Sequence, residues 1–178
     1  MARLADRPSA PKAGLLYTPE ERRRRDSSPW TIVQGILAPV QFLVFAISLA
    51  LILRYLATGE GLAAANASIV VKTLVLYTIM VTGSIWEKVV FGQYLFARPF
   101  FWEDMVSMLV LALHTAYLAC LYGDLLDHRA LMLLALAAYA SYVVNAAQFV
   151  LKLRAARLAA QATTGRAAAP PIALEPSR

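Results

Sequence analysis

The sequence is poor in cysteine and in charged residues. Cys120 is the single cysteine among 178 residues, which excludes an internal disulfide and any cysteine-based metal cluster. Only 16% of the residues are charged, whereas a typical soluble domain has about 25%. Hydrophobic residues make up 60% of the chain, and the mean hydropathy is +0.58. These shortages exclude an ordinary soluble domain and indicate an integral membrane protein.

Four hydrophobic stretches reach the roughly 20 residues that a spanning α-helix needs. They run from about Trp30 to Tyr55, Ser68 to Ile85, Phe100 to Tyr122, and Arg129 to Leu151. The first is longer than the apolar region of a signal peptide and no small-residue cleavage site follows it, so we expect it to remain as a helix. The sequence therefore predicts an all-α integral membrane protein with four transmembrane helices within residues 30–152. A basic tail, 1–29, precedes them, and an Ala/Pro-rich tail, 153–178, is predicted to be disordered.

The basic residues predict the orientation of these helices. Fourteen of the 17 lysines and arginines lie in the two tails or in the connector between the second and third spans. The other three are Arg54, Lys72 and Arg129, at or near the opposite ends of the spans. The positive-inside rule then places both termini and this connector in the cytoplasm. The Arg22 to Arg25 run is interpreted as a topology signal that contacts anionic lipid, so the high pI indicates no nucleic-acid partner.

Polar residues recur at helical spacing within the spans and should face the interior of the bundle. They are Gln34, Gln41 and Ser48 in the first span, Glu103, Ser107, His114 and Tyr117 in the third, and Ser141, Asn145, Gln148 and Lys152 in the fourth. The amides and Ser141 are expected mainly to form interhelical hydrogen bonds. Lys72 is expected to snorkel towards the periplasmic surface. His114 fits a satisfied core histidine as well as a ligand to a substrate metal.

The connector Trp86 to Asp104, WEKVVFGQYLFARPFFWED, differs from a solvated loop. It interleaves aromatic residues with charged and amide side chains, whereas a solvated loop is rich in Gly, Ser, Asn and Asp. This mixture suits a membrane interface and a large, flat ligand. Its charges also fit simple interfacial ion pairs, Glu87 with Lys88 and Asp104 with Arg98.

The strings WEKVVFGQYLFA and FFWED, within a stretch from about Tyr17 to Leu158, resemble the 3-vinyl (bacterio)chlorophyllide hydratase family of photosynthetic bacteria. Arg98 departs from the small or uncharged residue expected there. The resemblance implies addition of water to the C3 vinyl group of chlorophyllide a or a bacteriochlorin relative, giving the 3-(1-hydroxyethyl) group on the route to bacteriochlorophyll a. It also implies a multi-pass protein of the bacterial inner membrane, cytoplasmic or intracytoplasmic, beside other pigment-biosynthesis enzymes. No cofactor is implied, because the magnesium belongs to the substrate.

Hydration of a vinyl group needs an acid that protonates the terminal carbon and a base that activates water. A carboxyl group at the edge of the hydrocarbon layer keeps its proton more readily than one in water, and Glu103 is the predicted acid. Asp104 or Glu87 is the predicted second carboxylate. Adjacent helical positions point about 100° apart, so Glu87 is expected to be the better partner of Glu103.

The resemblance also directs attention to residues that suit the pigment. Aromatic side chains would wall the macrocycle, Lys88 or Arg98 would meet its carboxylate, and His114 is a candidate axial ligand to its magnesium. The predicted substrate-binding residues are His114, Trp86, Lys88, Gln93, Tyr94, Phe101, Trp102, Gln41 and Asn145.

Two other classes of protein share parts of this pattern. A non-catalytic pigment-binding or photosystem-assembly protein would use His114 as the magnesium ligand. Antenna helices favour alanine four residues before that histidine, however, where this chain has Val110. A haem-based electron carrier needs paired histidines within the membrane, and His128 falls in a short turn.

Overall fold

The computed structural model describes residues 16–168, with side chains described as far as residue 161. The regular structure within this range is helical. The elements are α1 (Pro19–Ser27), α2 (Pro29–Thr58), α3 (Leu62–Phe91), α4 (Phe101–Tyr122) and α5 (His128–Ala168).

Four of these helices, α2 to α5, are long and apolar enough to cross a membrane, which confirms the predicted number of spans. Even the shortest, α4 with 22 residues, is ~33 Å long at 1.5 Å per residue, slightly more than the hydrocarbon core. Helices α2 and α3 each have 30 residues and extend past the predicted apolar stretches at both ends.

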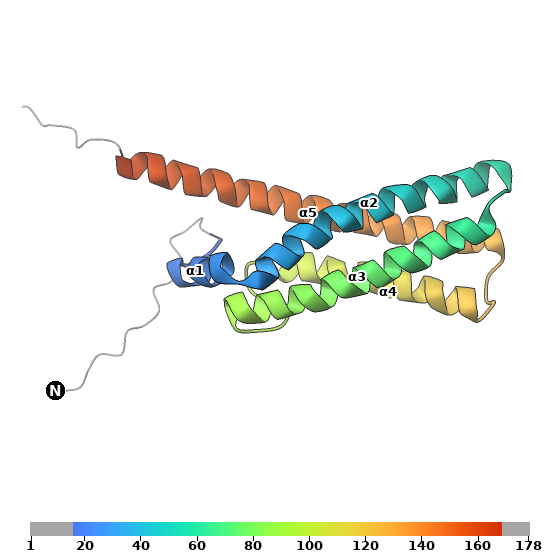
Figure 1. Cartoon of the computed structure of the whole chain (residues 1–178), viewed down its shortest axis with the longest axis horizontal. Coiled ribbons are helices and arrows are strands. Elements are labelled where there is room, and N and C mark those ends of the chain that lie inside the picture. The colour runs from blue at the N-terminus through green and yellow to red at the C-terminus, as the bar shows by residue number, and fades with distance from the viewer. Residues whose placement is uncertain (1–15, 169–178) are drawn as a thin grey trace, which may run out of the picture.

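The spanning helices form two antiparallel hairpins, α2–α3 and α4–α5, and packing is more extensive within each hairpin than between them. Figure 1 shows α1, the α3–α4 connector and the C-terminal part of α5 at one end of the bundle, and the two short hairpin loops at the other. We call the first the basic end, because Arg22 to Arg25, Lys88 and Arg98 lie there. The second is the opposite end.

Local sequence signals set the ends of the helices. Ser28 caps α2 by accepting a hydrogen bond from the Trp30 backbone N–H, and Pro29 occupies the first helical position. Gly59 ends α2 in the left-handed conformation, at φ 75°. Asp127 precedes α5 and accepts hydrogen bonds from the backbone N–H groups of Arg129 and Ala130.

Two segments that were predicted as tails are helical. Thr18 and Glu21 form a capping box that starts α1, so part of the 1–29 tail is ordered against α3. Helix α5 continues to Ala168, although a disordered tail was predicted from residue 153. Alanine, leucine and arginine dominate residues 153–160 and favour helix, and the prolines that break it begin only at Pro170. Residues 1–15 and 169–178 lie outside the described range.

Polar contacts between helices hold the bundle together. The Gln34 amide donates to Thr82 Oγ1 (2.8 Å) and links α2 to α3 at the basic end. Towards the opposite end, the Tyr139 hydroxyl of α5 donates to Ser48 Oγ (2.6 Å), which in turn bonds Ser68 Oγ (2.7 Å). The apolar core surrounds this second contact.

Candidate active site

The α3–α4 connector places two backbone N–H groups against two carboxyl groups. Helix α3 ends at Phe91 and is capped by Gly92, which has φ 86°, and the chain then turns back to α4. Phe96 has φ 59°, a left-handed conformation that costs a non-glycine residue energy and is often found at functional sites. In this turn the Phe96 N–H donates to Asp104 Oδ2 (2.7 Å) and the Ala97 N–H donates to Glu87 Oε2 (3.2 Å).

Glu87 and Asp104 form a buried carboxyl pair. They come from the last turns of α3 and the first turn of α4, and their side chains are 6% and 4% exposed. The N–H groups that they accept from are adjacent in the chain, so the two carboxyl groups lie close together. Two neighbouring carboxyl groups in a buried site favour sharing one proton, because two negative charges there would repel each other. The pair therefore suits proton transfer, as do other paired carboxyl groups in enzymes.

Glu103 has a different partner from the one that the sequence suggested. Its Oε2 lies 2.5 Å from Lys152 Nζ of α5, whereas Glu87 accepts from the Ala97 N–H, next to the N–H that binds Asp104. The expectation that Glu87 partners Glu103 is wrong, because adjacent residues of α4 point in different directions and Asp104 is the one that faces α3. Lys152 also donates to the Pro99 carbonyl oxygen, so this ion pair fastens α5 to the connector.

Asn145 is part of the framework of the site. Its amide nitrogen donates to the Glu103 carbonyl oxygen (2.8 Å), and its Oδ1 accepts from Ser107 Oγ (3.2 Å). The predicted interhelical role is confirmed for Asn145 and for Gln34. Ser141 instead bonds the Ala138 carbonyl within its own helix.

Trp86 belongs to an aromatic cluster that ties α1 to the spanning helices. The buried ring of Phe100 lies 5.8 Å from Trp86, Phe91 and Phe149, measured between ring centroids. Tyr17, just before α1, stacks on Phe91 at 5.8 Å. Burial in this cluster raises the pKa of the Tyr17 hydroxyl. These rings pack on each other, so Trp86 has a packing role at the basic end.

Other connector residues predicted to bind the pigment are exposed at the surface. The exposed fractions are 59% for Tyr94, 42% for Phe101 and 71% for Trp102, which suits an interfacial aromatic belt. Gln93 donates to the Leu95 carbonyl oxygen. Lys88 donates to the Gly92 carbonyl oxygen (2.8 Å) and lies 5.3 Å from the Tyr94 ring centroid.

A second polar group, which we call the mid-bundle layer, contains Gln41, Lys72 and His114. All three side chains are buried, at 2%, 0% and 0% exposure, so the expectation that Lys72 snorkels to the surface is wrong. Lys72 Nζ instead lies 3.8 Å from the ring centroid of Tyr142. His114 Nδ1 donates to the Val110 carbonyl (2.8 Å), and its ring stacks on Tyr139. His114 is ~15 Å along α4 from Asp104, so the mid-bundle layer is separate from the carboxyl pair.

The structure thus brings Glu87 and Asp104 together, sets Glu103 beside them with Lys152, and leaves Gln41 and His114 deeper in the bundle. Sequence reasoning missed Lys152 as a member of the site and the backbone N–H groups of Phe96 and Ala97. Lys152 carried a signal, because it is seven residues from Asn145 on the same polar stripe. The two N–H groups carried none. Within the described residues, no three His, Cys, Asp or Glu side chains gather as a metal site requires.

Comparison with known proteins identifies the family of this chain. The family model described as 2-vinyl bacteriochlorophyllide hydratase matches residues 17–155. The chain belongs to this family. A relative of that name from Cereibacter sphaeroides is 68% identical over 151 residues, which cover 85% of this chain and 93% of the relative. A second, from Rhodobacter capsulatus, is 63% identical over 153 residues, 86% of this chain and 89% of the relative.

The family match covers the carboxyl pair, the connector and all of α2 to α4. The family resemblance predicted from WEKVVFGQYLFA and FFWED is confirmed. The locants 2 and 3 are the older and the current numbers of the same vinyl-bearing ring carbon. No solved structure matches the fold of this hydratase family member.

Proposed function

We propose that this chain hydrates the vinyl group of a (bacterio)chlorophyllide, and that Glu87 and Asp104 move the proton. Membership of the hydratase family supports the reaction, and the carboxyl pair under the connector supports the site. The protein is then a hydro-lyase of bacteriochlorophyll biosynthesis. The observation that carries the assignment of residues is the pair of hydrogen bonds from the adjacent Phe96 and Ala97 N–H groups to these two buried carboxyl groups.

The reaction balances without an oxidant or a reductant. One proton adds to the terminal vinyl carbon, and the positive charge that develops on the adjacent carbon is shared with the macrocycle. Water then forms a C–O bond at that carbon and releases a proton, which gives the 1-hydroxyethyl group. We therefore propose that no added cofactor takes part and that magnesium enters only as part of the substrate.

The carboxyl pair has one proton to give and one carboxylate to receive, which is what this sequence of steps needs. The protonated member donates to the vinyl carbon, and the ionised member stabilises the developing cation and takes the proton from water. The N–H groups of Phe96 and Ala97 hold the carboxyl oxygens that face the connector, so the two groups stay oriented. This arrangement replaces Glu103 as the proposed acid.

Glu103 is proposed as a positioning residue. Its carboxylate is bound to Lys152 of α5, whereas the connector N–H groups of Phe96 and Ala97 bind Asp104 and Glu87. The ion pair fixes α4 and α5 against the connector that carries Phe96 and Ala97.

His114 is a weak candidate for the magnesium of the substrate. A histidine whose Nδ1 donates to a carbonyl keeps a lone pair on Nε2, and Nε2 lacks a hydrogen-bond partner among the described residues. The ring is 0% exposed and stacked on Tyr139, however, so a macrocycle has no access without separating the helices. The same burial weakens the alternative of a non-catalytic pigment carrier that uses His114.

The proposed setting is the bacterial inner membrane, with the basic end in the cytoplasm. The four apolar spans and the segregation of basic residues support this orientation. Reporter fusions after Leu62 and Asp127 should read periplasmic, and fusions after Lys88 and Arg157 cytoplasmic. A cytoplasmic signal at Leu62 would overturn the orientation.

Isotope labelling tests the reaction. Membranes that contain the full chain should convert 3-vinyl bacteriochlorophyllide in H₂¹⁸O to a product that carries ¹⁸O and is heavier by one water. Its red absorption band should move to shorter wavelength, because the vinyl group leaves the conjugated system. Product oxygen derived from O₂ would indicate an oxygenase and contradict the proposal.

A further inference from the structure

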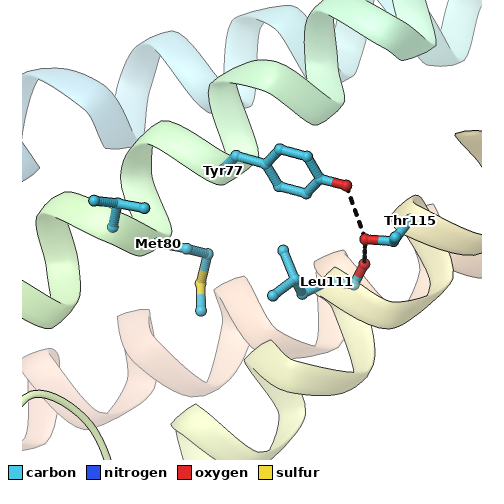
Figure 2. Close-up of a pocket in the computed structure, with 5 residues that line it drawn as sticks. Tyr77, Met80, Leu111 and Thr115 are labelled. Carbon is cyan, nitrogen blue, oxygen red and sulfur yellow. Dashed lines mark hydrogen bonds between the residues drawn. The ribbon is translucent and has the colours of Figure 1, made fainter.

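An apolar groove lies between α3 and α4, the two helices that carry the carboxyl pair. It has a volume of about 250 Å³ and is lined by Tyr77, Met80, Val81, Leu111 and Thr115. Figure 2 shows Tyr77 and Met80 on one helix facing Leu111 and Thr115 on the other. The Thr115 hydroxyl donates to the Leu111 carbonyl, so the 2.8 Å contact between Tyr77 and Thr115 is a bond donated by Tyr77. This bond bridges the two helices beside the groove.

By helical register, the groove and the candidate active site lie on the same faces of α3 and α4. Met80 and Glu87 are seven residues apart on α3, and Leu111 and Asp104 are seven apart on α4. Seven residues are close to two turns, so each pair shares a helix face and is separated by about 10 Å along the axis. The groove therefore lies two turns further from the basic end than the carboxyl pair, on the faces of α3 and α4 that carry Glu87 and Asp104.

A cation stands at the basic end of the same surface. Lys88 is seven residues from Val81 and eleven from Tyr77, which puts it on their face of α3. It is exposed, and its Nζ lies beside Tyr94. An apolar groove on the same helix faces as an acid pair and a lysine matches a ligand with an apolar body and an anionic edge.

We propose that the α3–α4 groove is the binding surface and lateral entrance for the tetrapyrrole macrocycle, with Lys88 meeting its carboxylate. This inference rests on the proposed function and assigns the substrate-contacting residues that it leaves open. Ligand pockets usually enclose about 300–1,000 Å³, so this groove takes one edge of the ring and leaves the rest against lipid. Met80 suits such a wall, since its thioether is flexible and packs well on aromatic faces.

Substitution by tryptophan tests the groove. Leu111→Trp fills it, and Leu109→Trp is the matched control, because Leu109 lies on the same helix, is 52% exposed and does not line the groove. Pigment binding is measured by absorbance in nanodiscs with Glu87→Gln as the background, so that turnover does not interfere. Leu111→Trp should weaken binding on the order of tenfold, and Leu109→Trp should leave it unchanged. Equal pigment affinities in Leu111→Trp and Leu109→Trp, whether or not both are weakened, would overturn the proposal that the pigment binds in the groove.

A photoreactive residue provides a second test that needs no loss of function. Placed at Met80, it should crosslink the pigment, whereas at Val71, which is exposed on the opposite side of α3, it should not. Crosslinking to lipid alone at Met80 would show that an acyl chain occupies the groove and would overturn the proposal.

Lys88→Gln separates the charge contact from the structure of the helix end. The variant should bind the free-acid pigment less tightly and the methyl ester as well as the parent does, because the ester carries no charge for Lys88 to meet. Equal losses for acid and ester would contradict the contact with the carboxylate. Failure of the groove leaves the proposed reaction intact if Glu87→Gln still abolishes turnover, so the two proposals fail separately.

Discussion

Glu87 and Asp104 each accept a hydrogen bond from the connector backbone, whereas Gln41, Lys72 and His114 each keep a buried polar atom without a hydrogen-bond partner among the described residues. The difference follows from where the two groups lie. Inside a spanning helix the backbone N–H groups are already bonded within the helix, so they are not free for side chains. At the basic end α3 has finished and α4 has just begun, and the connector offers free N–H groups.

The comparison teaches that polar content within the bundle does not by itself mark the reactive site. The mid-bundle layer is stabilised by aromatic faces, with Lys72 Nζ 3.8 Å from the Tyr142 ring centroid. A carboxyl pair that shares a proton needs donors at fixed positions, and these occur where helices end. The mid-bundle layer is therefore expected to matter for packing, and the basic end for chemistry.

The largest expected effect is on turnover when the carboxyl pair is changed. Glu87→Gln and Asp104→Asn keep size and hydrogen bonding but remove the group that transfers the proton. Because general acid–base catalysis contributes about 10²–10⁴-fold, kcat should fall by that factor while pigment binding remains. Steady-state assays in membranes measure kcat, and absorbance titration measures binding. Normal turnover in both variants would place the chemistry elsewhere and remove the distinction between the layers.

The conformation of Phe96 gives the next largest effect. Glycine adopts φ 59° without strain, whereas a β-branched residue does not, so Phe96→Gly should keep the two N–H groups in place and Phe96→Ile should displace them. Misplacing a catalytic group by about 1 Å costs up to ~10²-fold, and kcat of Phe96→Ile should fall ten- to a hundredfold. Both variants lose the ring contact between Phe96 and Phe101, so a difference in kcat between them does not come from that contact. Equal activities would exclude a role for the left-handed turn.

The Glu103–Lys152 ion pair is expected to affect stability more than catalysis. Glu103→Gln and Lys152→Met should each lower the thermal midpoint, since a hydrogen bond to a charged group contributes about 1.5–3 kcal/mol. The thermal midpoint of the double variant should fall by less than the sum of the two single changes, because the double variant leaves no unpaired charge behind. Turnover per folded molecule should change less than tenfold, below the general acid–base contribution of about 10²–10⁴-fold. A larger loss in Glu103→Gln at unchanged stability would restore Glu103 as the acid.

Much of the fold followed from the sequence, since span length and polar periodicity depend on residues near each other in the chain. The four spans and the buried stripe of Glu103, Ser107, His114 and Tyr117 are confirmed for this reason. Helix α1 was missed although Thr18 and Glu21 carry its capping box, because the prolines and arginines of that segment were interpreted as a tail.

The pairings within the site did not follow from the sequence. Whether Glu87 meets Glu103 or Asp104 depends on the rotation of α4 against α3. That rotation is set by the connector and by packing against α5, neither of which has a periodic signal. The contact of Lys152 with Glu103 likewise depends on how α5 crosses α4. The proposed active site is thus made of residues that the sequence selected, joined in a way that only the structure provides.

The smallest expected effect belongs to Lys72. Lys72→Met removes the buried amine of Lys72, whose Nζ has no hydrogen-bond partner among the described residues. The methionine side chain has a similar length. Turnover should stay close to that of the parent, and the thermal midpoint should stay or rise, since replacing a buried charge by an apolar side chain is often neutral or stabilising. Tyr142→Leu removes the aromatic face from the same contact and leaves the charge, so it should lower the midpoint instead. A thermal midpoint that falls in Tyr142→Leu but not in Lys72→Met, measured by thermal unfolding in nanodiscs, would assign the mid-bundle layer to packing. Loss of turnover in Lys72→Met with pigment still bound would instead bring this layer into the reaction.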